Sequence, residues 1–314
     1  MNPLSGLYAA ASGLRNRLYD RGSLRAQKLE RPVVSVGNLS AGGAGKTPFV
    51  IALGELLKAR GVSFDVLSRG YGRRTRGVLV VERDGAAADF GDEPLLLSRA
   101  LGIAVIVGES RYQAGLLAEK KFDSQLHILD DGFQHRSLAR DFDIVLLTGQ
   151  EFNDRLLPSG RLREPLSSLE RADAVVLPAD LPVARPELSG KVIWRMTRQI
   201  AIVHPPRSPI VFCGIARPEQ FFAQVRAAEI VSAAEIDYRD HHVYSQRDIR
   251  QLQTAKERAG ADGFLTTEKD AINLGALAEK LQPLAIAALS SSVENASDMV
   301  DTILSRIGKG RLRS

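Results

Sequence analysis

Residues Pro32 to Arg60 read PVVSVGNLSAGGAGKTPFVIALGELLKAR, and this stretch decides the fold. It begins with an apolar run, 33–36, that is typical of a buried strand. A glycine-rich loop follows at 40–45, and from Lys46 onward apolar residues recur at helical spacing. This order predicts a P-loop NTPase-like α/β fold, in which a mostly parallel sheet is flanked by helices.

The glycine-rich loop suits the phosphates of a nucleoside triphosphate. Glycines let several backbone N–H groups point inward, and the helix N-terminus adds partial positive charge. We expect Lys46 to reach the β- and γ-phosphates and the Thr47 hydroxyl to face Mg²⁺. The general motif has glycine at position 40, where this chain has serine, and a ligand-free turn is the alternative. The predicted nucleotide-binding residues are Ser40, Ala41, Gly42, Gly43, Ala44, Gly45, Lys46 and Thr47.

Composition indicates an ordinary globular protein. The chain has 314 residues, 44% hydrophobic and 25% charged, which predicts two domains with real cores. Its one cysteine, Cys213, lies in an apolar run, so neither a disulfide framework nor a cysteine metal site is expected. No apolar stretch reaches the roughly 18 residues that cross a bilayer, and the start lacks the pattern of a signal peptide. We therefore expect a cytoplasmic protein that can still bind a membrane surface.

The N-terminal segment, 1–31, carries most of the excess positive charge. It has six basic and two acidic residues, a net +4 of the +5 of the whole chain. Apolar residues recur there at helical spacing beside arginines, as in helices that lie in an anionic membrane interface. Packing on its own domain is the alternative. The basic residues form no aromatic-interleaved platform, so a nucleic-acid partner is not expected. The residues concerned are Leu4, Leu7, Tyr8, Ala11, Leu14 and Leu18, with Arg15, Arg17, Arg21, Arg25, Lys28 and Arg31.

Apolar strands alternate with helical patterns along the rest of the chain, which favours parallel strands joined by helices. The expected strands are 64–67, 78–81, 104–107, 126–129, 144–147 and 174–177. Proline-rich segments then surround a short apolar stretch. After them we expect a strand at 210–215, a helix from about 218 and a strand at 263–266. We expect a kinase-like domain at 32–190, a linker at 191–209 and a smaller α/β domain at 210–314.

Polar residues stand at the ends of several strands, where open α/β sheets bind ligands. Asp130 and Asp131 end an apolar strand and are expected to hold Mg²⁺ beside Thr47, although an acidic pair at a turn is the alternative. Adjacent residues of a strand point to opposite faces, so only one should face the metal fully unless the chain turns. Arg69, in a glycine loop after another strand, suits a phosphate.

Two further segments are ambiguous by themselves. Asp92, in Gly-Asp-Glu-Pro at 91–94, could be a helix N-cap. His241, in the segment 237–244, could be an ordinary loop residue.

Together these motifs resemble the tetraacyldisaccharide 4'-kinase family, the lipid A 4'-kinases of Gram-negative bacteria. The resemblance covers nearly the whole chain and also accounts for Ser40, since the family has a small hydroxyl residue there. It departs at Ser159 and Arg161, where the family pattern has alanine and proline. The motifs are VGNLSAGGAGKTP (36–48), SRGYG (68–72), GDEP (91–94), DDGFQH (130–135), LPSGRLREP (157–165), DHHVY (240–244) and TEKDA (267–271).

The resemblance implies phosphoryl transfer from ATP with Mg²⁺ to the 4'-hydroxyl of an acylated glucosamine disaccharide 1-phosphate. It implies a lipid substrate held at the cytoplasmic face of the inner membrane, with the chain bound peripherally or monotopically and no obligate protein partner. Asp92 would then be the general base, paired with His241, and Lys46 would neutralise the γ-phosphoryl group. Arg163 and Glu164 become substrate candidates at the rim of the site.

Two other protein classes share such loops. A membrane-attached ATPase switch has an extra lysine just before the two glycines, where this chain has Ala41. A metallochaperone-type GTPase needs a cysteine-rich metal motif, and no guanine-reading N-K-x-D segment is present either. ATP is therefore expected rather than GTP.

Overall fold

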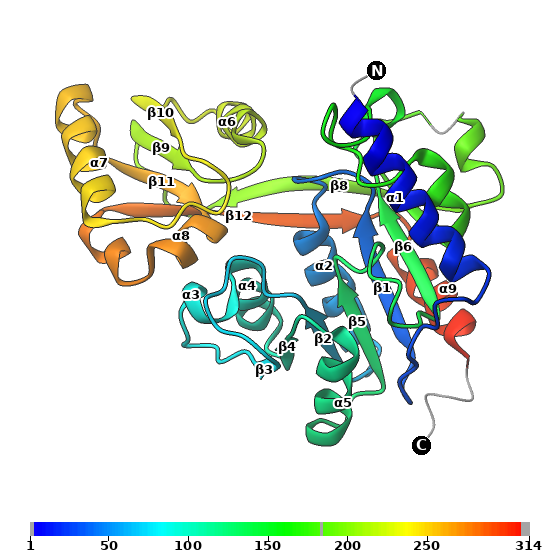
Figure 1. Cartoon of the computed structure of the whole chain (residues 1–314). Helices are drawn as coiled ribbons and strands as arrows, with labels where there is room; N and C mark the ends of the chain where they lie inside the picture. Colours follow the sequence, from blue (N-terminus) through cyan, green and yellow to red (C-terminus); the bar gives the residue numbers. More distant parts are fainter. Residues whose placement is uncertain (1–2, 183–184, 309–314) are drawn as a thin grey trace.

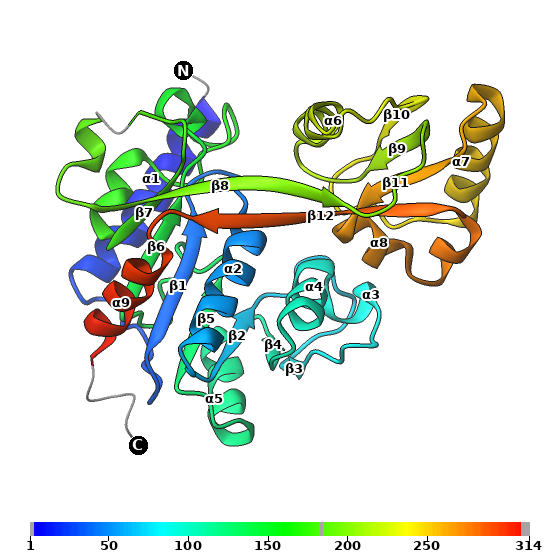
Figure 2. The same cartoon turned by 180° about the vertical axis from the view of Figure 1, so that it is seen from behind.

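One sheet of twelve strands runs through two lobes in the computed structural model, which describes residues 3–182 and 185–308 (Figure 1). Its strand order is β10-β9-β11-β12-β8-β7-β6-β1-β5-β2-β4-β3. The first lobe holds the strands from β7 to β3, and the second lobe holds β9, β10 and β11. The long strands β8 and β12 extend through both lobes (Figure 2).

The first lobe confirms the expected parallel sheet. Its parallel strands are β7 (Ala174–Pro178), β6 (Phe142–Leu146), β1 (Val33–Asn38), β5 (Leu126–Asp130), β2 (Phe64–Ser68) and β4 (Val105–Val107). The edge strand β3 (Leu79–Val80) pairs antiparallel to β4. Because all these strands but β3 run the same way, their carboxyl ends meet at one edge of the sheet, which is where the P-loop lies.

Helices cover both faces of this sheet. One face packs against α2 (Lys46–Ala59), α4 (Asp92–Leu101) and α9 (Ala296–Ile307). The other packs against α5 (Arg111–Lys121) and short 3₁₀ turns. These turns are η1 (Gln150–Asn153), η2 (Leu166–Arg171) and η3 (Pro186–Leu188), and the four-residue helix α3 (Ala87–Phe90) precedes α4.

The strand–loop–helix unit forms because its apolar pattern matches its burial. All six residues of β1 are buried, and Phe49, Leu53 and Leu57 of α2 point into the core at a spacing of four. Each such side chain contributes about 1.5 to 3 kcal/mol by leaving water. Gly37 cannot be replaced, since a Cβ there would lie 2.6 Å from the Cβ of Phe133.

The second lobe is a smaller α/β unit. Its strands β9 (Pro209–Cys213), β10 (Ala234–Asp237) and β11 (Gly263–Thr267) are parallel. The helices α7 (Gln246–Ala259) and α8 (Glu268–Leu274), with η4 (Gly275–Lys280), cover one face, and α6 (Pro218–Ala227) covers the other. Cys213 is buried in β9, as a packed strand residue.

The lobes are joined by two strands rather than by a loose segment. β8 (Val192–Ile202) lies within the expected linker, 191–209, and pairs antiparallel with β12 (Leu284–Val293). After β12 the chain returns to the first lobe, where α9 buries Met299, Val300 and Ile303 beside α2. The domain boundaries stay a prediction, but the first lobe contains residues from both ends of the chain.

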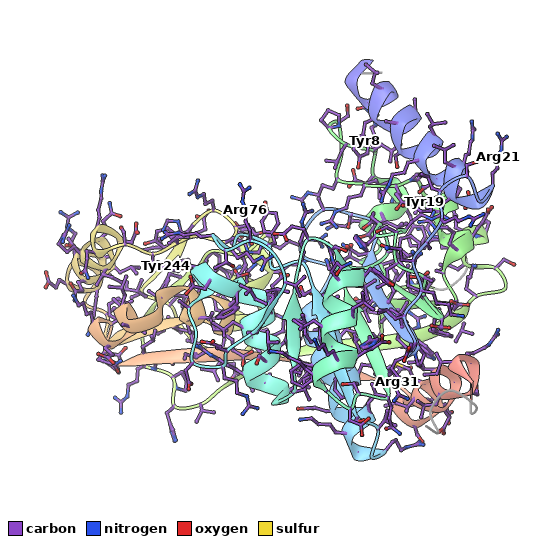
Figure 3. The ribbon with its side chains drawn as sticks, turned by 60° about the horizontal axis from the view of Figure 1, so that its bottom comes forward. Tyr8, Tyr19, Arg21, Arg31, Arg76 and Tyr244 are labelled. Atoms are coloured by element: carbon purple, nitrogen blue, oxygen red, sulfur yellow. The ribbon has the colours of Figure 1, made fainter. Side chains whose placement is uncertain are left out.

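Within the basic N-terminal segment, 1–31, the helix α1 (Pro3–Asp20) lies along the outside of the first lobe, and residues 21–31 lead to β1 without helical structure. Figure 3 shows Tyr8 and Tyr19 on the side of α1 nearest the protein and Arg21 just after the C-terminal end of the helix. Within the described residues, no helix combines the length and the apolar character needed to cross a bilayer.

Candidate active site

The P-loop has the backbone shape that a phosphate cradle requires. Gly42, Gly43 and Gly45 have φ values of 79°, 50° and 81°, a region that favours glycine. Over residues 3–182 and 185–308, the N–H groups of 42–45 donate to no other protein group. They stand at the N-terminus of α2, so they are available to an anion.

The start of the loop is braced from below. Ser40 is buried beneath the cleft, and its hydroxyl donates to Oε1 of the buried Glu151 at 2.8 Å. The N–H of Ala41 donates to the carbonyl of Arg161 at 2.8 Å. This explains the serine in place of glycine, because its hydroxyl binds a carboxylate. Sequence reasoning missed Glu151, because its neighbours in TGQEFND (148–154) are mostly polar and give no local sign that it is buried.

Lys46 and the two aspartates converge beside the loop. Lys46 Nζ lies 3.3 Å from Asp131 Oδ1 and donates to Asn38 Oδ1 at 3.2 Å. Asp131 also forms an ion pair with Arg163 at 2.9 Å. Burial raises the pKa of Asp131, but Lys46 and Arg163 outweigh it and bring the pKa to about 2. The Asp131 carboxylate is therefore ionised at neutral pH.

Asp130 is placed differently. Its carboxylate is fully buried, Oδ2 accepts from the Ser68 hydroxyl at 3.1 Å, and Oδ1 has no hydrogen-bond partner among the described residues. Burial, with the nearby Glu93 and Asp131, raises its pKa to about 7. The chain turns immediately after it, where Asp131 has a φ of 48°, so both side chains line the cleft.

These carboxylates fit a magnesium ion. An unpartnered buried carboxylate oxygen next to a phosphate cradle is a hard oxygen ligand, the kind that Mg²⁺ prefers. Thr47 lines the same cleft from the first turn of α2. Within the described residues no group of three or more His, Cys, Asp or Glu side chains could hold a metal by itself. Such a partial set matches an ion that also binds phosphate and water.

Asp92 and His241 form a pair across the two lobes. Asp92 is the first residue of α4, and His241 lies in the loop after β10. Nδ1 of His241 is 2.8 Å from Asp92 Oδ2, which also accepts from Asn273 at 3.1 Å. Burial opposes both charges, but their contact lowers the pKa of Asp92 and raises the pKa of His241. The geometry therefore favours a carboxylate held by an imidazolium.

Lys269 adds positive charge to this pair. Its Nζ lies 3.7 Å from Asp92 and from Glu93, and 3.2 Å from Asp240. The ring of Tyr71 contacts that of His241 at 5.0 Å between centroids. Sequence reasoning gave Lys269 no role beyond its place in the TEKDA motif and missed Asn273, because both belong to α8 of the second lobe and reach Asp92 only after folding.

Basic side chains line another part of the cleft. Arg69, Arg111, His135 and Arg163 all face it. Burial and the neighbouring Arg69 lower the pKa of Arg111 to about 10, and burial with Arg111 lowers the pKa of His135 to about 4. This wall is cationic at neutral pH apart from the histidine, so it suits an anionic substrate.

Glu164 is buried and already has hydrogen-bond partners. Its Oε2 accepts from Asn16 of α1 and from Arg171, each at 2.8 Å. The Tyr8 hydroxyl donates to the carbonyl of Arg163 at 3.0 Å. Residues 163–164 therefore connect α1 with Arg163, whose side chain forms the ion pair with Asp131.

The predicted site residues come together in one cleft of about 1480 Å³. Ser40 lies below it, and the others line it: Ala41, Gly42, Gly43, Ala44, Gly45, Lys46, Thr47, Arg69, Asp92, Asp130, Asp131, Arg163, Glu164 and His241.

Comparison with known proteins identifies relatives over nearly the whole chain. The chain is 46% identical to the tetraacyldisaccharide 4'-kinase of Koribacter versatilis, over 97% of this chain and 98% of that one. It is 39% identical to the enzyme of that name from Aquifex aeolicus, over 87% and 88% of the two chains.

The fold agrees as well. The crystal structure of LpxK from Aquifex aeolicus in complex with ATP matches with a TM-score of 0.80 and 35% identity, covering 97% of both chains. The family model described as tetraacyldisaccharide-1-P 4'-kinase matches residues 1–308. The chain therefore belongs to the tetraacyldisaccharide-1-P 4'-kinase family.

Proposed function

We propose that Asp92 is the general base in the reaction of this family, the ATP-dependent phosphorylation of the 4'-hydroxyl of tetraacyldisaccharide 1-phosphate in lipid A biosynthesis. The Asp92–His241 contact at 2.8 Å carries this proposal. It places an ionised carboxylate in the same cleft as the P-loop. An alcohol is a poor nucleophile until its proton has an acceptor.

The transfer step follows from these positions. Asp92 accepts the proton of the 4'-hydroxyl while the sugar oxygen bonds to the γ-phosphorus, and the bond from that phosphorus to the β–γ bridging oxygen breaks. ADP leaves with the electrons of that bond. His241 and Asn273 orient the carboxylate, since both contact its Oδ2.

Charge neutralisation accounts for much of the remaining barrier in phosphoryl transfer. Lys46 is positioned for the β- and γ-phosphates, and the N–H groups of the loop for the phosphate oxygens. Thr47, Asp130 and Asp131 would hold Mg²⁺, which when bound neutralises phosphate charge. The free Oδ1 of Asp130 supports this assignment.

The substrate enters beside the basic wall. Arg69, Arg111 and Arg163 form it, and their guanidinium groups suit the 1-phosphate and the sugar oxygens of an anionic glycolipid. Glu164 supports the rim next to Arg163, because its Oε2 accepts hydrogen bonds from Asn16 of α1 and from Arg171.

The direct test is transfer of labelled γ-phosphate from ATP to detergent-dispersed tetraacyldisaccharide 1-phosphate, with Lys46→Ala as the control. We expect label in the lipid with the unaltered protein and none with the variant. Hydrolysis of ATP without labelling of the lipid would contradict the proposal and favour a membrane-attached ATPase switch.

We further propose that α1 binds the cytoplasmic face of the inner membrane. The helix is oriented with its polar side toward the protein, where Tyr8 and Asn16 form hydrogen bonds. Its apolar side is open, since Leu7 and Leu14 are 69% and 58% exposed. The exposed Arg17 lies near that side of the helix, which suits anionic lipid headgroups.

Vesicle binding tests this orientation. Unaltered protein should sediment with vesicles of phosphatidylethanolamine and phosphatidylglycerol, and the double variant Leu7→Ser, Leu14→Ser should bind several-fold less. Val231→Ser is the matched control, because Val231 is 73% exposed on the second lobe. Equal binding of both variants would contradict a membrane role for α1.

A further inference from the structure

Two arginines outside the first lobe's P-loop unit touch its glycines. Arg198 lies on β8, and Arg217 precedes α6 in the second lobe. A Cβ on Gly43 would meet Cδ and Nε of Arg217 at 2.9 Å, and one on Gly45 would meet Nη1 of Arg198 at 3.0 Å. Both arginines line the cleft. Both side chains therefore lie directly against the glycines of the phosphate cradle.

Their guanidinium groups lack partners. Nε and Nη1 of Arg217 are buried, and no group within the described part of the chain bonds them. Neither arginine forms an ion pair there: Glu151 and Asp154 act on Arg217, and Asp180 on Arg198, only at longer range. A buried guanidinium donor without an acceptor destabilises a protein, so such a group points to a missing anion.

The two positive charges also repel each other. Burial lowers the pKa of Arg198, and the neighbouring Arg217 lowers it further. Burial lowers the pKa of Arg217 as well. Arginine stays protonated nonetheless, so the repulsion persists until an anion binds between or beside the two groups.

The P-loop and the start of α2 lack one backbone donor that these arginines could replace. Pro48 occupies the first turn of α2 and has no N–H, so the helix N-terminus offers the phosphates one donor fewer than usual. A guanidinium supplies planar, paired donors that match a phosphate group.

We propose that Arg198 and Arg217 bind the triphosphate of ATP and complete the phosphate site that the P-loop leaves open on its far side. The proposal rests on the nucleotide site of the proposed function. It also makes the second lobe part of that site, since Arg217 belongs to this lobe and β8 leads into it. The nucleotide would then hold the two lobes together through its phosphates.

Binding of a nucleotide series tests this assignment. Titration calorimetry with Mg²⁺ would compare adenosine, ADP and the β,γ-methylene analogue of ATP on unaltered protein, Arg198→Gln and Arg217→Gln. Each variant should bind the ATP analogue about 10-fold more weakly, as expected for a lost charge-assisted hydrogen bond. The loss of affinity for ADP should be smaller, and the affinity for adenosine should not change. Retained adenosine binding also shows that the variant is folded.

Two more variants sharpen the result. Arg198→Lys and Arg217→Lys keep the charge but lose the paired donors, so they should give intermediate affinities for the ATP analogue. Arg250→Gln, on the exposed side of α7, is the matched control and should bind every nucleotide normally.

Three outcomes decide the matter. Unchanged affinity for the ATP analogue would overturn the proposal. An equal loss for adenosine and the analogue would also overturn it, because the arginines would then act on the base or on lobe packing. If the unaltered protein bound no nucleotide, the phosphate site of the proposed function would itself be wrong.

Discussion

Two histidine–carboxylate contacts of nearly the same length stand in very different places. His241 Nδ1 lies 2.8 Å from Asp92 across the two lobes, and the histidine side chain is 24% exposed in the cleft. His127 Nδ1 lies 2.7 Å from Asp65 inside the first lobe, with both side chains fully buried. The first pair is near the P-loop, and the second is at the opposite end of strands β2 and β5.

The difference shows that position decides what the same ion pair does. His127 also lies 3.4 Å from Glu119, which accepts the N–H of Arg31. Burial lowers the pKa of His127, but the two carboxylates outweigh it and raise the pKa to about 9. This cluster ties β2, β5, α5 and the segment before β1 together. It has no access to substrate, so it stabilises the fold, whereas we propose that the cleft pair serves the reaction.

Removing the Asp92 carboxylate of the cleft pair should have the largest effect on kcat. Asp92→Asn keeps the shape but removes the proton acceptor, so kcat should fall by about 10²- to 10⁴-fold. The KM for ATP should change little, since Lys46 and the loop are intact. Initial rates of lipid phosphorylation at varied ATP measure both. Unchanged turnover would remove Asp92 from the role of base.

Removing the buried histidine should instead destabilise the protein. His127→Gln leaves the buried Asp65 and the partly buried Glu119 without their cation, which should lower the free energy of unfolding by about 3 to 5 kcal/mol. Denaturant titration measures it, with the exposed His204→Asn as a nearly neutral control. The kcat of the folded variant at low temperature should match that of the unaltered protein; a loss of kcat there would refute the contrast.

Replacing the cleft histidine should have a smaller effect on rate. His241→Gln removes a charge-assisted hydrogen bond that orients Asp92, so kcat should fall about 10-fold. Stability should change little, because the site is partly solvated. Rates and unfolding midpoints measured together check this. A stability loss as large as that of His127→Gln would make the two pairs equivalent.

Alkaline pH should destabilise the unaltered protein by removing the charge of His127 from its buried pair with Asp65. The pKa of His127, about 9 in the folded chain, exceeds its ordinary value of 6.5. Its stabilising contribution is therefore complete below about pH 6.5 and is lost as the pH rises through about 9. The unfolding midpoint of the unaltered protein should fall over that pH range. The difference between its midpoint and that of His127→Gln should therefore become smaller. A constant gap would show that His127 is not charged in the fold.

Local patterns predicted the P-loop, the acidic strand end and most strands, because neighbouring residues specify them. The Asp92–His241 pair was expected only from the family resemblance, since the two residues come from different lobes. Arg198 and Arg217 gave no local signal, because their position against the loop depends on how β8 and the second lobe fold.

The buried cluster did leave a trace in the sequence. Asp65 and His127 are each the second residue of a strand and have apolar neighbours on both sides, and they are direct partners in the pairing of β2 with β5. Strand order is needed to see that two opposite charges meet there. Sequence motifs do not give this strand order, whereas the folded sheet does.

The return of α9 to the first lobe bears on how the chain is made. Its side chains, among them Met299 and Ile303, complete the core beside α2, yet they are synthesised only after the whole second lobe. The core around the P-loop therefore closes after the second lobe has been made, and that lobe can fold first. A stop codon between β12 and α9 would therefore damage the ATP site, although the P-loop itself would be intact.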